Sequence, residues 1–136
     1  MNNIQTKAPP KNQQVNSFRI FQQKYSQNKK NKYFLTLFSI ENRIFIIELL
    51  DDMSKISEQI REDVEKLPTK SNAPHNLYVS FNKIFMYKEL YFQANFEDIT
   101  DKFINNQLAD LFRFNVYNKI ANFIHTYIKL IDMTKK

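Results

Sequence analysis

The stretch that decides the fold is Tyr33–Leu50, YFLTLFSIENRIFIIELL, in which two apolar runs flank the polar pair Glu41-Asn42. The runs Tyr33–Ile40 and Arg43–Leu50 are rich in Ile and Phe, and two such runs around a polar pair are typical of a β-hairpin. One continuous helix is the alternative, because buried strands and buried helices both read as unbroken apolar runs. We predict the hairpin and keep the helix open.

A helix is predicted over about residues 52–67, after the hairpin. Its apolar residues recur at three- and four-residue intervals, as on one face of a helix: Met53, Ile56, Ile60, Val64 and Leu67. Asp51 or Asp52 is the expected N-terminal cap. Pro68 is expected to end the helix, because proline lacks the amide hydrogen that a further turn requires.

Further strands are predicted on either side of these elements. Residues 17–25 form a short alternating segment before a polar, basic link over 26–32. Apolar and polar residues alternate over 77–81 and again over 89–97, so each segment presents one face to a core. Asn82-Lys83 or a nearby pair is the expected turn between these two strands.

A long C-terminal helix is predicted over about residues 111–133. Within FRFNVYNKIANFIHTYIKLIDM, which begins at Phe112, the polar residues fall on one narrow stripe, and nearly everything else is apolar. The stripe consists of Asn118, Asn122, His125 or Thr126, and Lys129. Because a surface helix needs only one apolar face, we expect the surplus to pack against a partner's helix.

The predicted order of elements is three strands, a helix, two strands and a final helix. Five strands with a helix between the third and the fourth are typical of the OB-fold, a small, partly open barrel that often binds single-stranded nucleic acid. The predicted fold class is therefore mainly β with helices. One five-stranded OB-fold domain, including the C-terminal helix, is expected over residues 17–136, after a flexible polar tail over 1–16.

The composition narrows the range of functions. The 136 residues include no Gly and no Cys, which leaves no glycine-rich phosphate loop, disulfide, thiolate zinc site or cysteine nucleophile. His75 and His125 lie far apart in sequence, without a metal-ligand pattern around them. We expect no enzyme activity, no cofactor or metal, no small-molecule substrate, no membrane-spanning segment and no secretory signal. A net charge of +6 is compatible with a polyanionic partner.

Two segments carry a resemblance to a known family. They are Val116-Tyr117-Asn118 followed by Ile124-His125-Thr126-Tyr127, and, before them, the segment ELYFQANFE that begins at Glu89. With these segments the chain resembles the smallest subunit of replication protein A, the single-stranded-DNA-binding heterotrimer, and its relatives in telomere- and telomerase-associated complexes. The order of predicted elements agrees with that family over residues 17–133.

The resemblance implies a non-catalytic, nuclear subunit that joins two larger OB-fold subunits. Each subunit would contribute one helix to a three-helix bundle, and single-stranded DNA would be bound mainly by the larger subunits. General replication and telomere maintenance both remain open. The residues expected at the partner interface are Val116, Tyr117, Ile120, Ile124, Tyr127, Ile128 and Ile131.

Weak direct contact with nucleic acid is expected at the loops on the rim of the barrel. These loops hold Lys29, Lys30, Lys32 and Lys83, whose clustered charge would attract phosphate. Tyr33 or Tyr87 would then offer a ring for base stacking. The simpler interpretation, which we favour, is a solvated lysine loop beside core aromatics.

Two other functions fit the same pattern, since a fold does not fix a function. One is a partner-binding adaptor or dimerisation module of α+β type, unrelated to DNA. The other is an accessory subunit of a large organellar complex, which would be mostly helical and requires a helix over Tyr33–Leu50.

Overall fold

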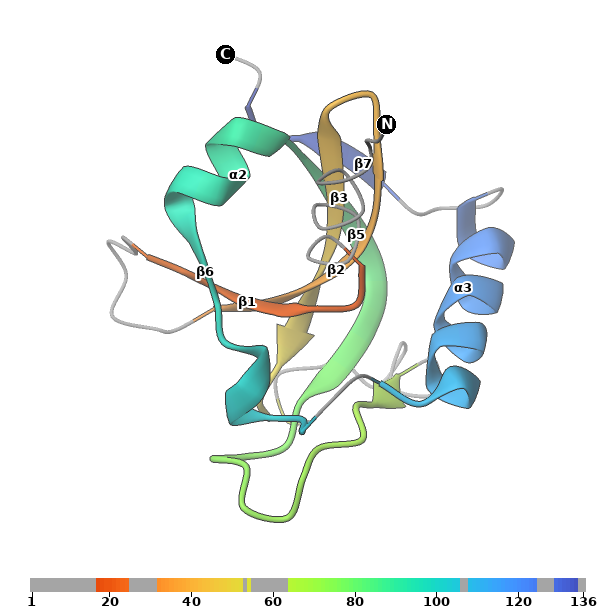
Figure 1. Cartoon of the computed structure of the whole chain (residues 1–136). Helices are drawn as coiled ribbons and strands as arrows, with labels where there is room; N and C mark the ends of the chain where they lie inside the picture. The colour runs from red at the N-terminus through yellow and green to blue at the C-terminus, as the bar shows by residue number, and fades with distance from the viewer. Residues whose placement is uncertain are drawn as a thin grey trace, which may run out of the picture.

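The computed structural model describes residues 17–24, 32–52, 54, 64–105, 108–124 and 129–134, except for the side chains at positions 82, 123, 124, 129 and 130. Within these residues, seven strands form one curved sheet, and two α-helices lie on opposite sides of it (Figure 1). The predicted mainly β class is confirmed. The predicted tail over residues 1–16 lies outside the described residues.

The sheet has the order β4-β5-β3-β2-β1-β6, with neighbouring strands antiparallel. Its strands are β1 (Ile20–Gln23), β2 (Tyr33–Ile40), β3 (Arg43–Leu50), β4 (Glu65–Lys66), β5 (Tyr78–Lys88), β6 (Phe96–Asp98) and β7 (Lys129–Asp132). The strand β7 lies beside β5 and runs parallel to it. The described strands form an open sheet, and the five-stranded OB-fold barrel that the sequence predicts is not confirmed.

The hairpin predicted over Tyr33–Leu50 is confirmed. Its strands β2 and β3 pair from Tyr33 opposite Leu49 to Ile40 opposite Arg43, which excludes the helical alternative. Glu41 and Asn42 form the two-residue turn with φ values of 50° and 65°. Turns with two left-handed residues match the twist of the paired strands. Here they form without glycine.

The turn predicted at Asn82-Lys83 is wrong, because β5 continues through both residues. Val79 pairs with Leu49 and Ile84 pairs with Ile47, so residues 80–83 of β5 lie opposite the single residue Glu48 of β3. Extra residues of this kind form a bulge, which bends a strand and shifts its side chains between faces. The long curve of β5 is visible in Figure 1. Because the bulge interrupts the alternation of apolar and polar residues along β5, the sequence at Asn82-Lys83 resembles a turn.

The strand predicted over 89–97 is mostly a helix. Residues Glu89–Asn95 form α2, and only Phe96–Asp98 continue as the strand β6. Phe92 and Phe96 are both buried, whereas Leu90 is 81% exposed. Apolar residues four apart fit one side of a helix as well as alternation fits a strand. Burial of the two rings therefore favours a helix that leaves Leu90 outside.

The C-terminal helix is shorter than predicted. Helix α3 runs over Asp110–Ile124, and Lys129–Asp132 form β7 on the edge of β5. By pairing with β5, the backbone of β7 satisfies the hydrogen-bonding groups along this edge of β5. A helix that protruded from the domain would leave the edge unpaired.

The helix predicted over 52–67 is also not continuous, since Glu65–Lys66 form β4. At its predicted start, the Ser54 amide donates a hydrogen bond to Oδ1 of Asp52 over 2.9 Å, in agreement with the predicted cap. Residues 55–63 lie outside the described part of the chain.

Two apolar clusters cover the two faces of the sheet. The larger one lies between the sheet, α3 and the segment before α3, and includes Leu35, Ile47, Phe103 and Val116. The smaller one lies under α2 and consists of Phe21, Phe34, Ile44, Ile46, Tyr87, Phe92 and Phe96. Because both faces of β2 and β3 are covered, these strands read in the sequence as continuous apolar runs.

Glu41→Gly is expected to raise the free energy of unfolding by about 1 kcal/mol, because a non-glycine residue in the left-handed region costs about that much. Chemical denaturation of the two proteins measures the difference. Ser39→Gly, in the adjacent strand, is the control and should lower stability by about 0.5–1 kcal/mol. A loss of stability in Glu41→Gly would contradict the left-handed turn.

Phe92→Ala is expected to lower the free energy of unfolding by about 3–5 kcal/mol, because it leaves a cavity under α2. Leu90→Ala should change it by less than about 0.5 kcal/mol, since Leu90 is exposed. Denaturation curves of both variants check the helix. If this segment were a strand, Leu90 and Phe92 would lie on the same face. Similar losses of unfolding free energy in the two variants would therefore contradict the helix.

Candidate functional site

Helix α3 has an inner apolar row that packs against the chain's own core. Phe112, Val116 and Ile120 recur every four residues along α3, and all three are buried in the larger cluster. The sequence predicts Val116 and Ile120 at a partner interface, and this placement is wrong. The helix needs one apolar side for its own domain, and these residues supply it.

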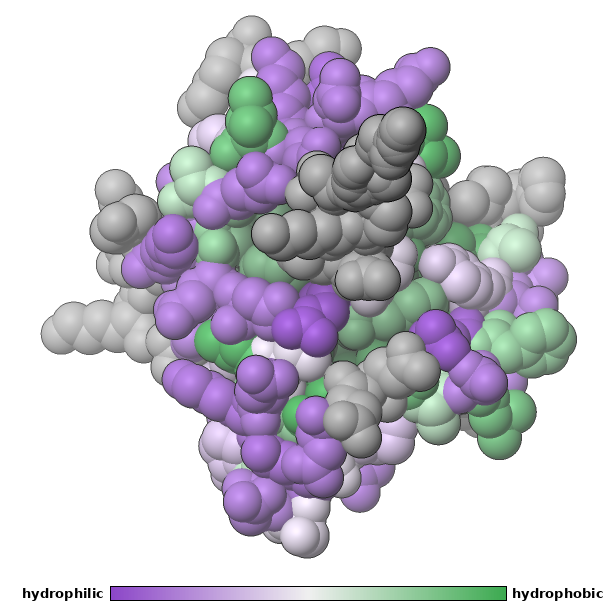
Figure 2. Space-filling view, viewed as in Figure 1, coloured by the Kyte–Doolittle hydropathy of each residue, from purple (hydrophilic) through white to green (hydrophobic). Residues whose placement is uncertain are grey.

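The outer side of α3 carries a second set of apolar residues, which is unusual for a helix that already has a buried row. Leu111 is 70% exposed and Phe114 is 63% exposed, with Tyr117 exposed at their flank. Figure 2 shows apolar side chains gathered over α3 on this face of the molecule. We call Leu111, Phe114 and Tyr117 the outer row.

The sequence prediction of surplus apolar surface on this helix is therefore confirmed for the described residues, although Tyr117 is the only member of the outer row that the sequence placed at the interface. Leu111 and Phe114 are absent from the predicted interface. Helical spacing places both of them opposite the row formed by Phe112, Val116 and Ile120. The sequence pattern could therefore have identified Leu111 and Phe114 as the exposed apolar residues. Asn118 and Asn122 are exposed, as predicted.

Tyr117 joins α3 to the hairpin. Its hydroxyl donates a hydrogen bond to the carbonyl oxygen of Leu37 over 2.8 Å, and its ring meets the Phe18 ring edge-on at 4.9 Å. Partial burial raises the pKa of the Tyr117 hydroxyl above its ordinary value, with a smaller opposing effect of Arg113. Tyr117 thus fixes the helix while leaving part of its ring exposed.

The other predicted interface residues do not lie together on a described helix. Ile131 belongs to β7, pairs with Phe85 of β5 and is half-buried, so its predicted place on a C-terminal helix is wrong. Ile124 is the last residue of α3, and its side chain is outside the described part. Tyr127 and Ile128 also lie outside the described residues.

The structure describes two of the four predicted nucleic-acid-binding lysines. Lys32 is exposed just before β2, and Lys83 is exposed in the bulge of β5. These two strands lie on either side of β3. Lys29 and Lys30 lie outside the described residues. Lys83 therefore lies within a strand and not in the loop that the sequence predicts for it.

Tyr33 and Tyr87, the rings proposed for base stacking, are both buried. The favoured interpretation as core aromatics is confirmed for these two residues. The ring of Tyr91 in α2 lies beside Tyr87 and is 44% exposed; it stacks on Tyr87 with 5.4 Å between centroids and 5° between planes.

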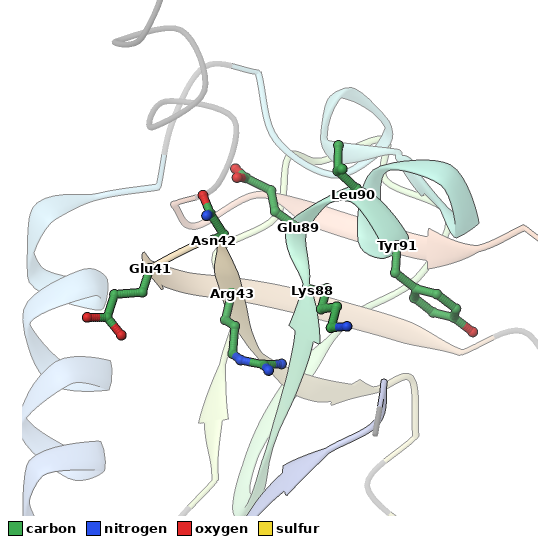
Figure 3. Close-up of a pocket in the computed structure, with 7 residues that line it drawn as sticks. All are labelled: Glu41, Asn42, Arg43, Lys88, Glu89, Leu90 and Tyr91. Carbon is green, nitrogen blue, oxygen red and sulfur yellow. The ribbon is translucent and has the colours of Figure 1, made fainter. Parts of the chain in front are cut away.

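A pocket of about 560 Å³ lies where the tip of the β2–β3 hairpin meets the start of α2. The Glu89 amide donates a hydrogen bond to the carbonyl oxygen of Asn42 over 2.8 Å, which fixes the two segments together. Figure 3 shows the residues that line the pocket: Glu41, Asn42, Arg43, Lys88, Glu89, Leu90 and Tyr91. The sequence does not predict this site, because the site depends on the helix α2 in a segment predicted to be a strand.

Two cations lie side by side in this pocket. Arg43 of β3 and Lys88 of β5 are directly opposite in the strand register. The Arg43 guanidinium forms an ion pair with Asp132 at 3.0 Å. Because Asp132 is the last residue of β7, this ion pair also fixes the end of that strand. Burial raises the pKa of the neighbouring Tyr87 hydroxyl to about 12, with a further contribution from Tyr91.

His75 is the one histidine among the described residues. His75 packs against the rings of Tyr33 and Phe103 at 5.3 and 5.4 Å between centroids, which fits a structural role in the core. No group of three or more acidic, histidine or cysteine side chains with metal-binding geometry occurs in the part of the chain that the structure describes. None of its described helices has the length and apolar character needed to cross a bilayer.

Comparison of the chain with protein-family models, with curated proteins and with solved structures finds no match.

The raised pKa of Tyr87 predicts a loss of stability at high pH. The folded protein retains the phenolic proton up to a pKa of about 12, whereas the unfolded chain loses it at the ordinary value of 10.0. The contribution is complete below pH 10 and is lost as the pH rises toward 12. Tyr87→Phe should flatten this fall in a series of denaturation curves. An unchanged slope in the variant would contradict the assignment.

Proposed function

We propose that this chain is a non-catalytic structural subunit of a single-stranded-DNA-binding complex, similar to the smallest subunit of replication protein A. It assembles with two larger OB-fold subunits in the nucleus, in a replication complex or a telomere- or telomerase-associated one. Its contribution is organisation of the complex, and the larger subunits hold most of the DNA.

The observation that carries this proposal is the outer row of α3. A helix that buries Phe112 on one side and exposes Leu111 and Phe114 on the other leaves apolar area in water. Burial of a large apolar side chain contributes about 1.5–3 kcal/mol, so burial of these two residues against a partner would favour the contact by about 3–6 kcal/mol before the cost of association. Two helices that pack along such a row form an ordinary helix-helix interface.

The association with DNA rests on the resemblance of the C-terminal and ELYFQANFE segments, on the mainly β fold and on the net charge of +6. The family's three-helix bundle would form around α3, with the outer row in place of the deeper residues that the sequence suggested.

A second candidate is a partner-binding adaptor that has no connection with DNA. The observation that favours it is α2, which occupies the place where the last strand of an OB-fold barrel is expected. In this alternative the outer row binds a partner in the same way, but the partner is not an OB-fold protein.

Affinity purification of the tagged full chain from its own cells, with identification of bound proteins by mass spectrometry, tests the proposal. The double variant Leu111→Asp, Phe114→Asp should lose the partners at least tenfold, because it places two charges in an apolar interface. Ile40→Asp, a matched change at an exposed residue of β2, should retain them.

Recovery of two larger OB-fold proteins with the unmodified chain and with Ile40→Asp, but not with the double variant, is the expected result. Recovery of unrelated proteins in the same pattern would favour the adaptor. Equal recovery with all three chains would refute the outer row as the interface.

A further inference from the structure

The pocket between the hairpin tip and α2 combines the two chemical features that a strand of nucleic acid requires. It has positive charge for phosphate and a fixed, exposed ring for a base. The residues concerned come from three elements, β3, β5 and α2, so the combination exists only in the folded chain.

The positive charge comes from Arg43 and Lys88. Like charges directly opposite on paired strands repel each other. Among the described residues, an ion pair with a carboxylate offsets the charge of Arg43 but not that of Lys88. Arg43 is paired with Asp132 and also donates to the hydroxyl of Thr134 at 3.4 Å, so it is held in place. Lys88 is exposed beside it and has the reach to contact a phosphate.

The ring is that of Tyr91. Its stack on the buried Tyr87 fixes the orientation of the ring, so little conformational entropy is lost when a base covers the outer side. The neighbouring Leu90 is 81% exposed and adds apolar surface to the pocket. A ring whose inner side is covered and whose outer side is open is suited to stacking.

The acidic residues of the pocket lie away from this part. Glu41 and Glu89 also line it. Figure 3 shows that their carboxylates point away from the side on which Lys88 and Tyr91 extend. A phosphate beside Lys88 and a base on Tyr91 would therefore not meet either carboxylate directly.

The geometry points to a binding site for single-stranded nucleic acid at this pocket, with phosphate at Lys88 and Arg43 and a base on Tyr91. The site lies at the hairpin tip, apart from the lysines predicted at the loops. The inference extends the proposed function, because it gives this subunit a direct contact with the strand that its complex would bind. It does not depend on the outer row of α3.

Fluorescence anisotropy of a labelled oligothymidylate of about 12 nucleotides, titrated with the full-length chain, tests the site. Tyr91→Ala is expected to weaken binding about tenfold, and Tyr91→Phe should retain it, because stacking needs the ring alone. Lys88→Gln is expected to weaken binding about fivefold at about 0.1 M salt and to lower the salt slope by about 0.7, the effect of one lost phosphate contact.

Lys66→Gln is the matched control. It removes the same charge from an exposed position on β4, which pairs with the end of β5 opposite the pocket. Circular dichroism of every variant checks that the fold is retained. Equal losses in Lys66→Gln and Lys88→Gln would indicate general attraction and would overturn the site, as would unchanged binding in Tyr91→Ala.

Polyglutamate, which carries charge without rings, distinguishes a nucleic acid from an acidic peptide. It should compete poorly with the oligonucleotide, and competition as strong as that of unlabelled oligothymidylate would overturn the proposal. If the outer row is not a partner interface, the result of these titrations does not change. If the pocket does not bind nucleic acid, the recovery of partners does not change, so the two proposals are tested separately.

Discussion

The register between β3 and β5 is the constraint on which the rest of the structure depends. It places the bulge of residues 80–83 opposite Glu48, so that the two halves of β5 serve both apolar clusters. At its other end it sets Arg43 opposite Lys88 and brings the start of α2 against the hairpin turn. A shift by one residue would move every side chain of β5 to the other face, so the core specifies this register strongly.

The helix α3 combines a role in folding with the role in assembly that we propose for it. Its buried row closes the larger cluster, and the hydrogen bond from Tyr117 to Leu37 fixes it against β2. Of the outer row, Leu111 and Phe114 take part in neither contact, whereas Tyr117 is partly exposed and also makes the second one. Exposed apolar area of this kind is a usual mark of an interaction surface, because water alone would favour polar residues there. Leu111 and Phe114 can therefore be changed without removing either contact.

The absence of glycine influences the fold at a few positions. The turn of the hairpin places Glu41 and Asn42 in the left-handed region, and Phe18 is also left-handed, with φ values of 50°, 65° and 53°. Asn adopts this conformation at low cost, whereas Glu and Phe do so only when the surrounding structure compensates. Pairing of β2 with β3 and burial of Phe18 provide that compensation.

The sequence by itself determined the mainly β class, the hairpin over Tyr33–Leu50 and the apolar surplus of the last helix, because these depend on residues close together in the chain. Only the tertiary structure decided that residues 89–95 form α2 and residues 129–132 join β5 as a strand. In both segments the local pattern fits helix and strand equally well, and the choice follows from which surface is available for burial or pairing. The pocket of Arg43, Lys88 and Tyr91 belongs to the same category, since the β3–β5 register and α2 must both exist before its residues meet.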